Sequence, residues 1–97
     1  MKFIIENKVY DTEKAECVCE FEKSVDKILQ MFGIERTFRE YKPAKLYKTK
    51  KDSWFSVADL GDRKRIILED EISAKRIISS KHDIYLYNKY FDDLEEA

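Results

Sequence analysis

The chain has 97 residues, of which 40% are charged and 13% are aromatic, and its formal net charge is −1. This length suits one domain with a single core, and the aromatic content argues against intrinsic disorder. The balanced charge predicts neither attraction to nucleic acid nor repulsion from it. The apolar runs are too short for a membrane-spanning helix or the core of a signal peptide, so we expect a cytoplasmic protein.

The first part of the chain is predicted to form strands. Residues 1–10 resemble a short hairpin with a turn near Glu6. Residues 15–22 alternate in a way that is typical of a half-buried strand with an acidic outer face. One face carries Ala15, Cys17, Cys19 and Phe21, and the other carries Glu16, Val18, Glu20 and Glu22.

A helix is predicted over residues 25–32. Ser24 is a typical N-cap and Gly33 a typical stop signal. The apolar residues between them lie at helical spacing: Val25, Ile28, Leu29 and Phe32. Residues 34–41 are predicted to be extended, because Pro43 disfavours helix just before it.

The central segment 46–60, LYKTKKDSWFSVADL, is predicted to form two strands joined by a charged turn at residues 50–53. A further turn at Gly61 leads to a strand over residues 64–68.

Two helices are predicted after it. The first covers residues 70–80. The second begins at Asp83 and has an apolar stripe of Ile84, Tyr87, Phe91 and Leu94. Tyr87 is expected in the core and Tyr85 at an exposed interface.

The sequence thus predicts one α+β domain over residues 1–97. It consists of a small antiparallel sheet of four to five strands, one inserted helix and two C-terminal helices.

Charge is unevenly distributed. Residues 36–51 hold seven bases and one acid, while residues 11–22 hold five acids and one base. A second acidic cluster comprises Asp92, Asp93, Glu95 and Glu96. The basic segment, with Trp54 nearby, suits phosphate binding and base stacking, or alternatively a solvated edge hairpin that resists aggregation. The acidic clusters suit a basic groove made for nucleic acid, or simply solubility.

No catalytic or metal-binding constellation is evident. Cys17 and Cys19 would need two further good ligands to hold zinc, and His82 is the only histidine. No elbow motif surrounds a serine or cysteine, and neither glycine belongs to a phosphate-binding loop. We therefore expect no enzyme activity, no cofactor and no metal, and we expect reduced thiols.

Three blocks of the chain resemble a family of short proteins from phages and mobile elements of Gram-positive bacteria. KVYDTEKAE at residues 8–16 is similar to the family's K-x-Y-D-T-x-x-A-E opening. LYKTKKDSWF at residues 46–55 is similar to its L-Y-[KR]-T-K-K-G-x-[WYF]-F hairpin. Residues 73–97 resemble its two closing helices. Asp52 replaces the usual turn glycine, which implies a different turn type, and residues 21–41 have no counterpart in the family pattern.

The resemblance implies an accessory protein of a mobile element, and such proteins include anti-CRISPR inhibitors. We therefore expect an inhibitor that binds a CRISPR effector and blocks nucleic-acid loading or cleavage. The expected contact residues are Lys48, Lys50, Lys51, Trp54, Asp92, Asp93, Glu95 and Glu96. The first alternative is a nucleic-acid-binding accessory protein that uses the basic segment Arg36–Lys51, and the second is a structural or assembly subunit that associates with itself.

Overall fold

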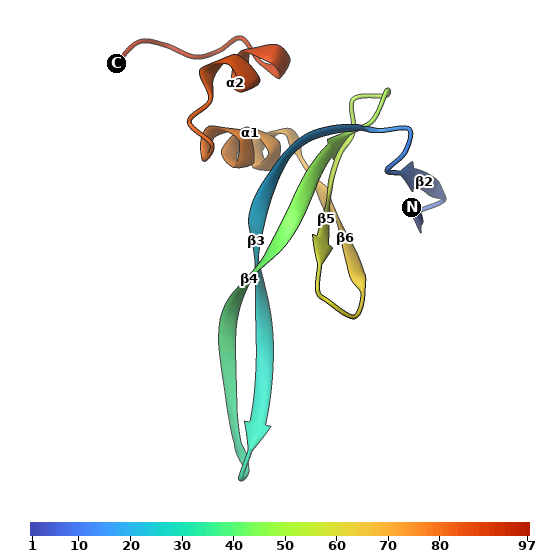
Figure 1. The fold of residues 1–97 in the computed structure, drawn as a ribbon, viewed down its shortest axis with the longest axis vertical. Coiled ribbons are helices and arrows are strands. Elements are labelled where there is room, and N and C mark those ends of the chain that lie inside the picture. Colours follow the sequence, from blue (N-terminus) through green and yellow to red (C-terminus); the bar gives the residue numbers. More distant parts are fainter.

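The computed structural model describes the backbone of residues 1–97 and the side chains of residues 1–26, 30 and 32–97 (Figure 1). Its elements are the strands β1 (Lys2–Ile5), β2 (Lys8–Asp11), β3 (Glu16–Met31), β4 (Ile34–Lys48), β5 (Trp54–Asp59) and β6 (Lys64–Glu69), followed by the helices α1 (Glu71–Ser79) and α2 (Ile84–Tyr90).

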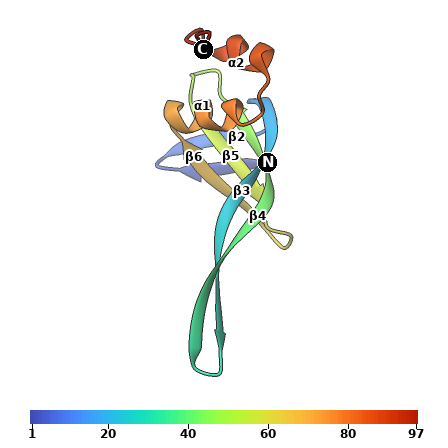
Figure 2. The ribbon, with the colours of Figure 1, turned by 90° about the vertical axis from the view of Figure 1, so that its left-hand side faces the viewer.

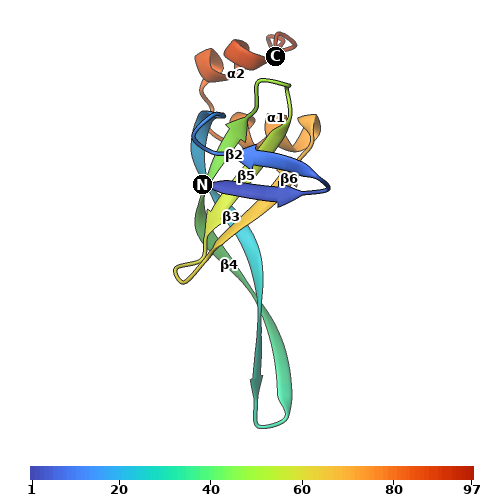
Figure 3. The same ribbon diagram turned by 90° about the vertical axis from the view of Figure 1, so that its right-hand side faces the viewer.

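The strands form two antiparallel sheets. β1 and β2 pair only with each other, and β3–β4–β5–β6 form a four-stranded meander in chain order. The α+β class and the two C-terminal helices are confirmed. The prediction of a single antiparallel sheet is wrong in part. The N-terminal hairpin is a separate sheet that lies across one face of the meander (Figure 3).

Both faces of the meander are covered near its base, by different elements. The helices pack on one face, where Leu46, Trp54 and Ile78 form the centre of a buried cluster (Figure 2). On the other face, Phe55 packs between Tyr10 and Tyr47, with ring centroids 5.4 and 5.1 Å apart. Large apolar residues therefore alternate between two cores along β4 and β5.

Beyond this base, β3 and β4 continue alone as a two-stranded ribbon, residues 24–41, which we call the arm (Figure 1). β5 pairs with β4 only from Ala44 onwards. The arm makes the molecule elongated, with extents of 52 × 39 × 20 Å. The radius of gyration is 15.9 Å, against about 13 Å for a compact chain of this length.

The helix predicted over residues 25–32 is wrong, because residues 25–31 belong to β3 and Phe32 lies in the turn that follows. The side chains of Ile28 and Leu29, which were half of the predicted stripe, lie outside the described residues. Gly33 does not end a helix. It follows Phe32 in a two-residue turn in which both residues have positive φ, +53° and +74°, as in a type I′ hairpin turn. Residues 34–41 are extended, as predicted.

The predicted faces of residues 15–22 are also partly wrong. The register of β3 against β4 shifts between Cys17 and Cys19, because a bulge occurs at Val18. The bulge places Val18 in the helix-side core, with Cys19 and Phe21 packed against it, and it leaves Cys17 exposed. A one-residue insertion reverses the alternation on which the prediction depended.

The helices begin close to where the sequence predicted them, and each is capped by an aspartate. The Asp70 and Asp83 carboxylates accept hydrogen bonds from the N–H groups of Ser73 and Leu86, at 2.7 and 3.0 Å. α2 is shorter than predicted, because Phe91 is its extended C-cap. Ile84 and Leu94 are exposed rather than part of an apolar stripe, whereas Tyr87 is buried as predicted.

Candidate binding surfaces

The predicted acidic contact residues lie in the segment that follows α2. Asp93 is held at two points, because the Tyr87 hydroxyl donates to Oδ1 and Lys75 Nζ pairs with Oδ2, both at 2.6 Å. The hydrogen bond from Lys75, and then that from Tyr87, lowers the pKa of Asp93. Phe91 stacks on Trp54, with ring centroids 5.7 Å apart. The segment is therefore attached to both α1 and the sheet.

This attachment separates the predicted acidic residues by role. Asp93 makes internal contacts, whereas Asp92, Glu95 and Glu96 are exposed. Tyr85 on α2 is also 84% exposed, in agreement with the sequence prediction. The helical end thus presents carboxylates from the attached segment and an aromatic side chain from α2.

Two of the acidic residues predicted on the outer face of β3 pair with other residues of the same chain. Glu16 accepts a hydrogen bond from the Tyr90 hydroxyl at 2.6 Å and pairs with Lys89 at 3.0 Å. These bonds, the Tyr90 bond first, lower the pKa of Glu16. Glu20 pairs with Lys45 at 3.9 Å, and Glu22 is exposed.

Lys48 and Trp54, two of the predicted contact residues, lie between the sheet and α2. Trp54 is only 7% exposed, and its ring belongs to the core on the helix side. Lys48 Nζ lies 5.6 Å from the centroid of Trp54 and 5.5 Å from that of Tyr90, and it pairs with Asp52 at 3.1 Å. Both side chains therefore help to attach α2 to the sheet.

In the turn at residues 49–53, Asp52 adopts a backbone conformation that glycine adopts easily. Asp52 has a φ of +62°, a left-handed conformation that Asp tolerates better than most residues. The Thr49 hydroxyl accepts the Ser53 N–H at 3.0 Å. The turn holds Lys50 and Lys51 exposed at its tip, as the sequence predicted.

The basic segment 36–51 does not form one surface. Residues 36–48 run along β4, so successive residues face opposite sides of the sheet over roughly 40 Å. Lys42, Lys45 and Lys48 have acidic neighbours, at 3.5, 3.9 and 3.1 Å. The linear clustering of basic residues therefore does not become a spatial cluster.

A spatial cluster of lysines does occur elsewhere, in a groove of about 910 Å³ between the N-terminal hairpin and the 49–53 turn. We call it the lysine groove. It is lined by Lys2, Lys8, Lys14, Lys50 and Lys51. The lysines come from three separate parts of the chain, so no local sequence pattern could have predicted the groove. Asp11 also lines it, but its carboxylate accepts the Glu13 N–H at 2.9 Å.

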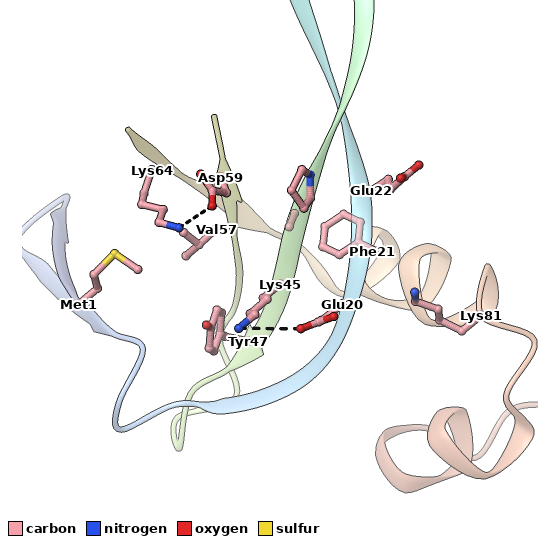
Figure 4. A pocket seen from close by; sticks show the side chains of 12 residues that line it. Met1, Glu20, Phe21, Glu22, Lys45, Tyr47, Val57, Asp59, Lys64 and Lys81 are labelled. Atoms are coloured by element: carbon pink, nitrogen blue, oxygen red, sulfur yellow. Dashed lines mark hydrogen bonds and ion pairs between the residues drawn. The ribbon is translucent and has the colours of Figure 1, made fainter. Parts of the chain in front are cut away.

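A second hollow of about 450 Å³ lies at the foot of the arm (Figure 4). Its polar side chains largely pair with one another, Lys64 with Asp59 at 2.8 Å and Lys45 with Glu20 at 3.9 Å. Phe21, Tyr47 and Val57 supply much of the apolar lining. This arrangement lacks the convergent polar groups that fix the orientation of a small ligand.

Among the side chains that the structure describes, no group of three or more His, Cys, Asp or Glu residues is placed to hold a metal ion. Within the same part of the chain, no helix is both long and apolar enough to cross a membrane. His82 is exposed in the turn between the helices. Comparison with family models, curated proteins and solved structures gives no match for this chain.

Proposed function

We propose that this protein is a phage or mobile-element inhibitor of a bacterial defence system, an anti-CRISPR protein that binds a CRISPR effector and blocks nucleic-acid loading or cleavage. The proposal depends on one observation above the others. Asp93 is bound by Tyr87 and Lys75, and this attachment holds the exposed carboxylates of Asp92, Glu95 and Glu96 at one end of the molecule.

Carboxylates held on an anchored segment suit a basic groove that normally binds a phosphate backbone. Their charge attracts such a groove at long range and raises the association rate. The exposed ring of Tyr85 adds apolar contact area of the kind that is enriched at binding hot spots. The inhibitor occupies the basic groove of the effector without catalysing a reaction, so inhibition is stoichiometric.

The test is a charge-reversed triple variant, Asp92→Lys with Glu95→Lys and Glu96→Lys. We expect its affinity for the cognate effector to fall more than about tenfold, mainly through a slower association rate. Biolayer interferometry against purified CRISPR effectors, at two salt concentrations, measures both rates. The control triple Glu6→Lys, Glu13→Lys and Asp62→Lys makes the same charge change at exposed positions elsewhere.

Equal affinity for the two triple variants would exclude the C-terminal segment as the contact. Absence of binding to every effector in the panel, with no protection of target DNA from cleavage, would contradict the inhibitor proposal itself.

A second candidate function is favoured by the lysine groove. A nucleic-acid-binding accessory protein would place the phosphate backbone along Lys2, Lys8, Lys14, Lys50 and Lys51. This differs from the basic segment Arg36–Lys51 in that only Lys50 and Lys51 belong to both.

Fluorescence anisotropy with single- and double-stranded DNA tests this candidate. The unaltered protein is expected to bind DNA with an affinity that falls steeply as the salt concentration rises. The double variant Lys50→Glu with Lys51→Glu is expected to lose this binding. The control pair Arg76→Glu and Lys81→Glu changes two exposed bases outside the groove and is expected to have a smaller effect. Absence of binding by the unaltered protein at low salt would contradict this function.

A further inference from the structure

Among its described residues, the arm carries large apolar side chains that are exposed to solvent. Phe32 is 94% exposed, Ile34 57% and Phe38 44%. A two-stranded ribbon without a covered face has marginal stability in water, and three or more strands with a hydrophobic face are normally needed. A partner that adds strands to the arm would therefore stabilise it.

The backbone of β4 offers an edge for such a partner. In a two-residue hairpin the residues that flank the turn exchange hydrogen bonds, so Ile34 and every second residue after it direct their backbone groups to β3. The odd-numbered residues 35–41 direct theirs to the opposite edge. β5 reaches that edge only from Ala44, next to Pro43, which has no N–H to donate.

The twist of the ribbon makes this edge accessible. The two strands cross at the foot of the arm, and beyond the crossing β4 lies on the side away from the β5–β6 hairpin (Figures 1, 2 and 3). A second strand can therefore approach β4 without meeting the rest of the sheet.

The side chains along this edge of one copy are complementary to the same side chains in a second copy. In antiparallel pairing about a two-fold axis at Thr37, Glu35 lies opposite Arg39 of the second copy and Arg39 lies opposite its Glu35. On the other face, Arg36 lies opposite Phe38, a favourable cation–π pair. The arm thus matches a second arm in charge and in aromatic contact.

Other registers are less favourable. Axes at Arg36 or Arg39 would place two arginines opposite each other. An axis at Phe38 would place the second copy's turn opposite Pro43 and Ala44, where β5 begins to pair. The outer edge of β3 carries Glu20, Glu22 and Asp26 on one face, so two β3 edges would bring like charges together.

We propose that the arm binds a second copy of this chain, β4 against β4 about Thr37, to form a two-fold dimer with a continuous four-stranded ribbon β3–β4–β4–β3. Ile34 and Phe38 of both copies then share one face of that ribbon. The contact spans residues 34–40 of each copy, which is small for a protein interface, so the dimer is weak and depends on concentration.

The test is sedimentation velocity of the full chain from about 1 µM to about 1 mM, a range that covers weak association. The unaltered protein is expected to shift from monomer to dimer. Glu35→Arg and Arg39→Glu each turn both symmetric charge pairs repulsive, and each is expected to raise the dimer Kd at least about tenfold. Glu22→Arg, on the outer edge of β3, is the matched control and is expected to leave the Kd unchanged.

The decisive sample is an equimolar mixture of the Glu35→Arg and Arg39→Glu proteins. Each variant repels itself, but one copy of each restores both attractive pairs, so the mixture is expected to dimerise like the unaltered protein. Circular dichroism confirms that each variant is folded. A monomer at every concentration, a dimer that the single substitutions leave intact, or a mixture that stays monomeric would each overturn the proposal.

Discussion

The base of the meander and the arm are made from the same two strands, β3 and β4, yet they have opposite environments. At the base, both faces are covered, and Leu46 and Phe55 are fully buried. In the arm, every described β4 residue from Ile34 to Arg39 is exposed. The boundary is the point where β5 and the helices end, which shows that strand formation and core formation are separable in this chain.

The comparison teaches where stability and binding reside. Burial of apolar area is the main stabilising contribution to folding, so the base determines whether the protein folds. The described residues of the arm contribute little of that burial, and they present side chains that a folding requirement does not explain. Substitutions at the two places should therefore have different consequences.

The largest difference is expected between two phenylalanines of neighbouring strands. Phe55→Ala removes a ring packed between Tyr10 and Tyr47 and should lower the free energy of unfolding by about 3–5 kcal/mol. Phe38→Ala, in the arm, should lower it by less than about 1 kcal/mol. Urea denaturation followed by Trp54 fluorescence measures both, and equal losses would contradict the separation of base and arm.

A smaller effect is expected at the foot of the arm. The Glu69 side chain, 5% exposed, accepts from Lys23 at 2.7 Å and from the buried Ser56 hydroxyl at 2.8 Å. Glu69→Ala leaves both donors without this acceptor and should cost about 2–3 kcal/mol in the same denaturation assay. Glu35→Ala, an exposed carboxylate in the arm, is the control and should be nearly neutral. A neutral Glu69→Ala would mean that this network does not stabilise the base of the meander beside the arm.

Acid should loosen the helical end. The Lys75 and Tyr87 hydrogen bonds lower the pKa of Asp93, so their stabilising contribution is present above the unfolded-state pKa and is lost as the pH falls through the lower folded pKa. Because Phe91 stacks on Trp54, release of the segment should change Trp54 fluorescence below about pH 4. Asp93→Asn should abolish this step, and a step that persists in this variant would assign it to another carboxylate.

The smallest effect is expected at the arm turn. Phe32 has a φ of +53°, which is unfavourable for a bulky side chain but suits asparagine. Phe32→Asn should stabilise the hairpin by about 1 kcal/mol, seen as roughly fivefold slower hydrogen exchange of arm amides. Phe32→Ser removes the same ring without the preference for positive φ and should not slow exchange. Equal exchange in the two variants would exclude backbone strain at Phe32.

Much of the fold follows from local patterns in the sequence. Alternation and turn residues predicted the N-terminal hairpin, the central hairpin and the strand at residues 64–68, and acidic starts with apolar residues at helical spacing predicted both helices. The error at residues 25–32 arose because Ser24 and Gly33 suit a helix cap and stop as well as a strand and a hairpin turn. A short apolar run does not distinguish the two.

The candidate surfaces were less predictable, because they depend on residues far apart in the chain. Exposure of Lys50, Lys51, Asp92 and Glu95 follows from local polarity. The burial of Trp54 under Tyr90 and Phe91 does not, nor does the use of Asp93 and Glu16 as internal acceptors. The lysine groove likewise exists only once the N-terminal hairpin lies beside the central turn.

The bulge at Val18 also makes the two thiols chemically different. Cys17 is exposed, whereas burial raises the pKa of Cys19. Since the thiolate is the reactive species, alkylating reagents at neutral pH should modify Cys17 first. The chain therefore carries its own attachment point for a spin label or fluorophore, on the sheet rather than on the arm, from which distances to a bound partner can be measured without a new cysteine.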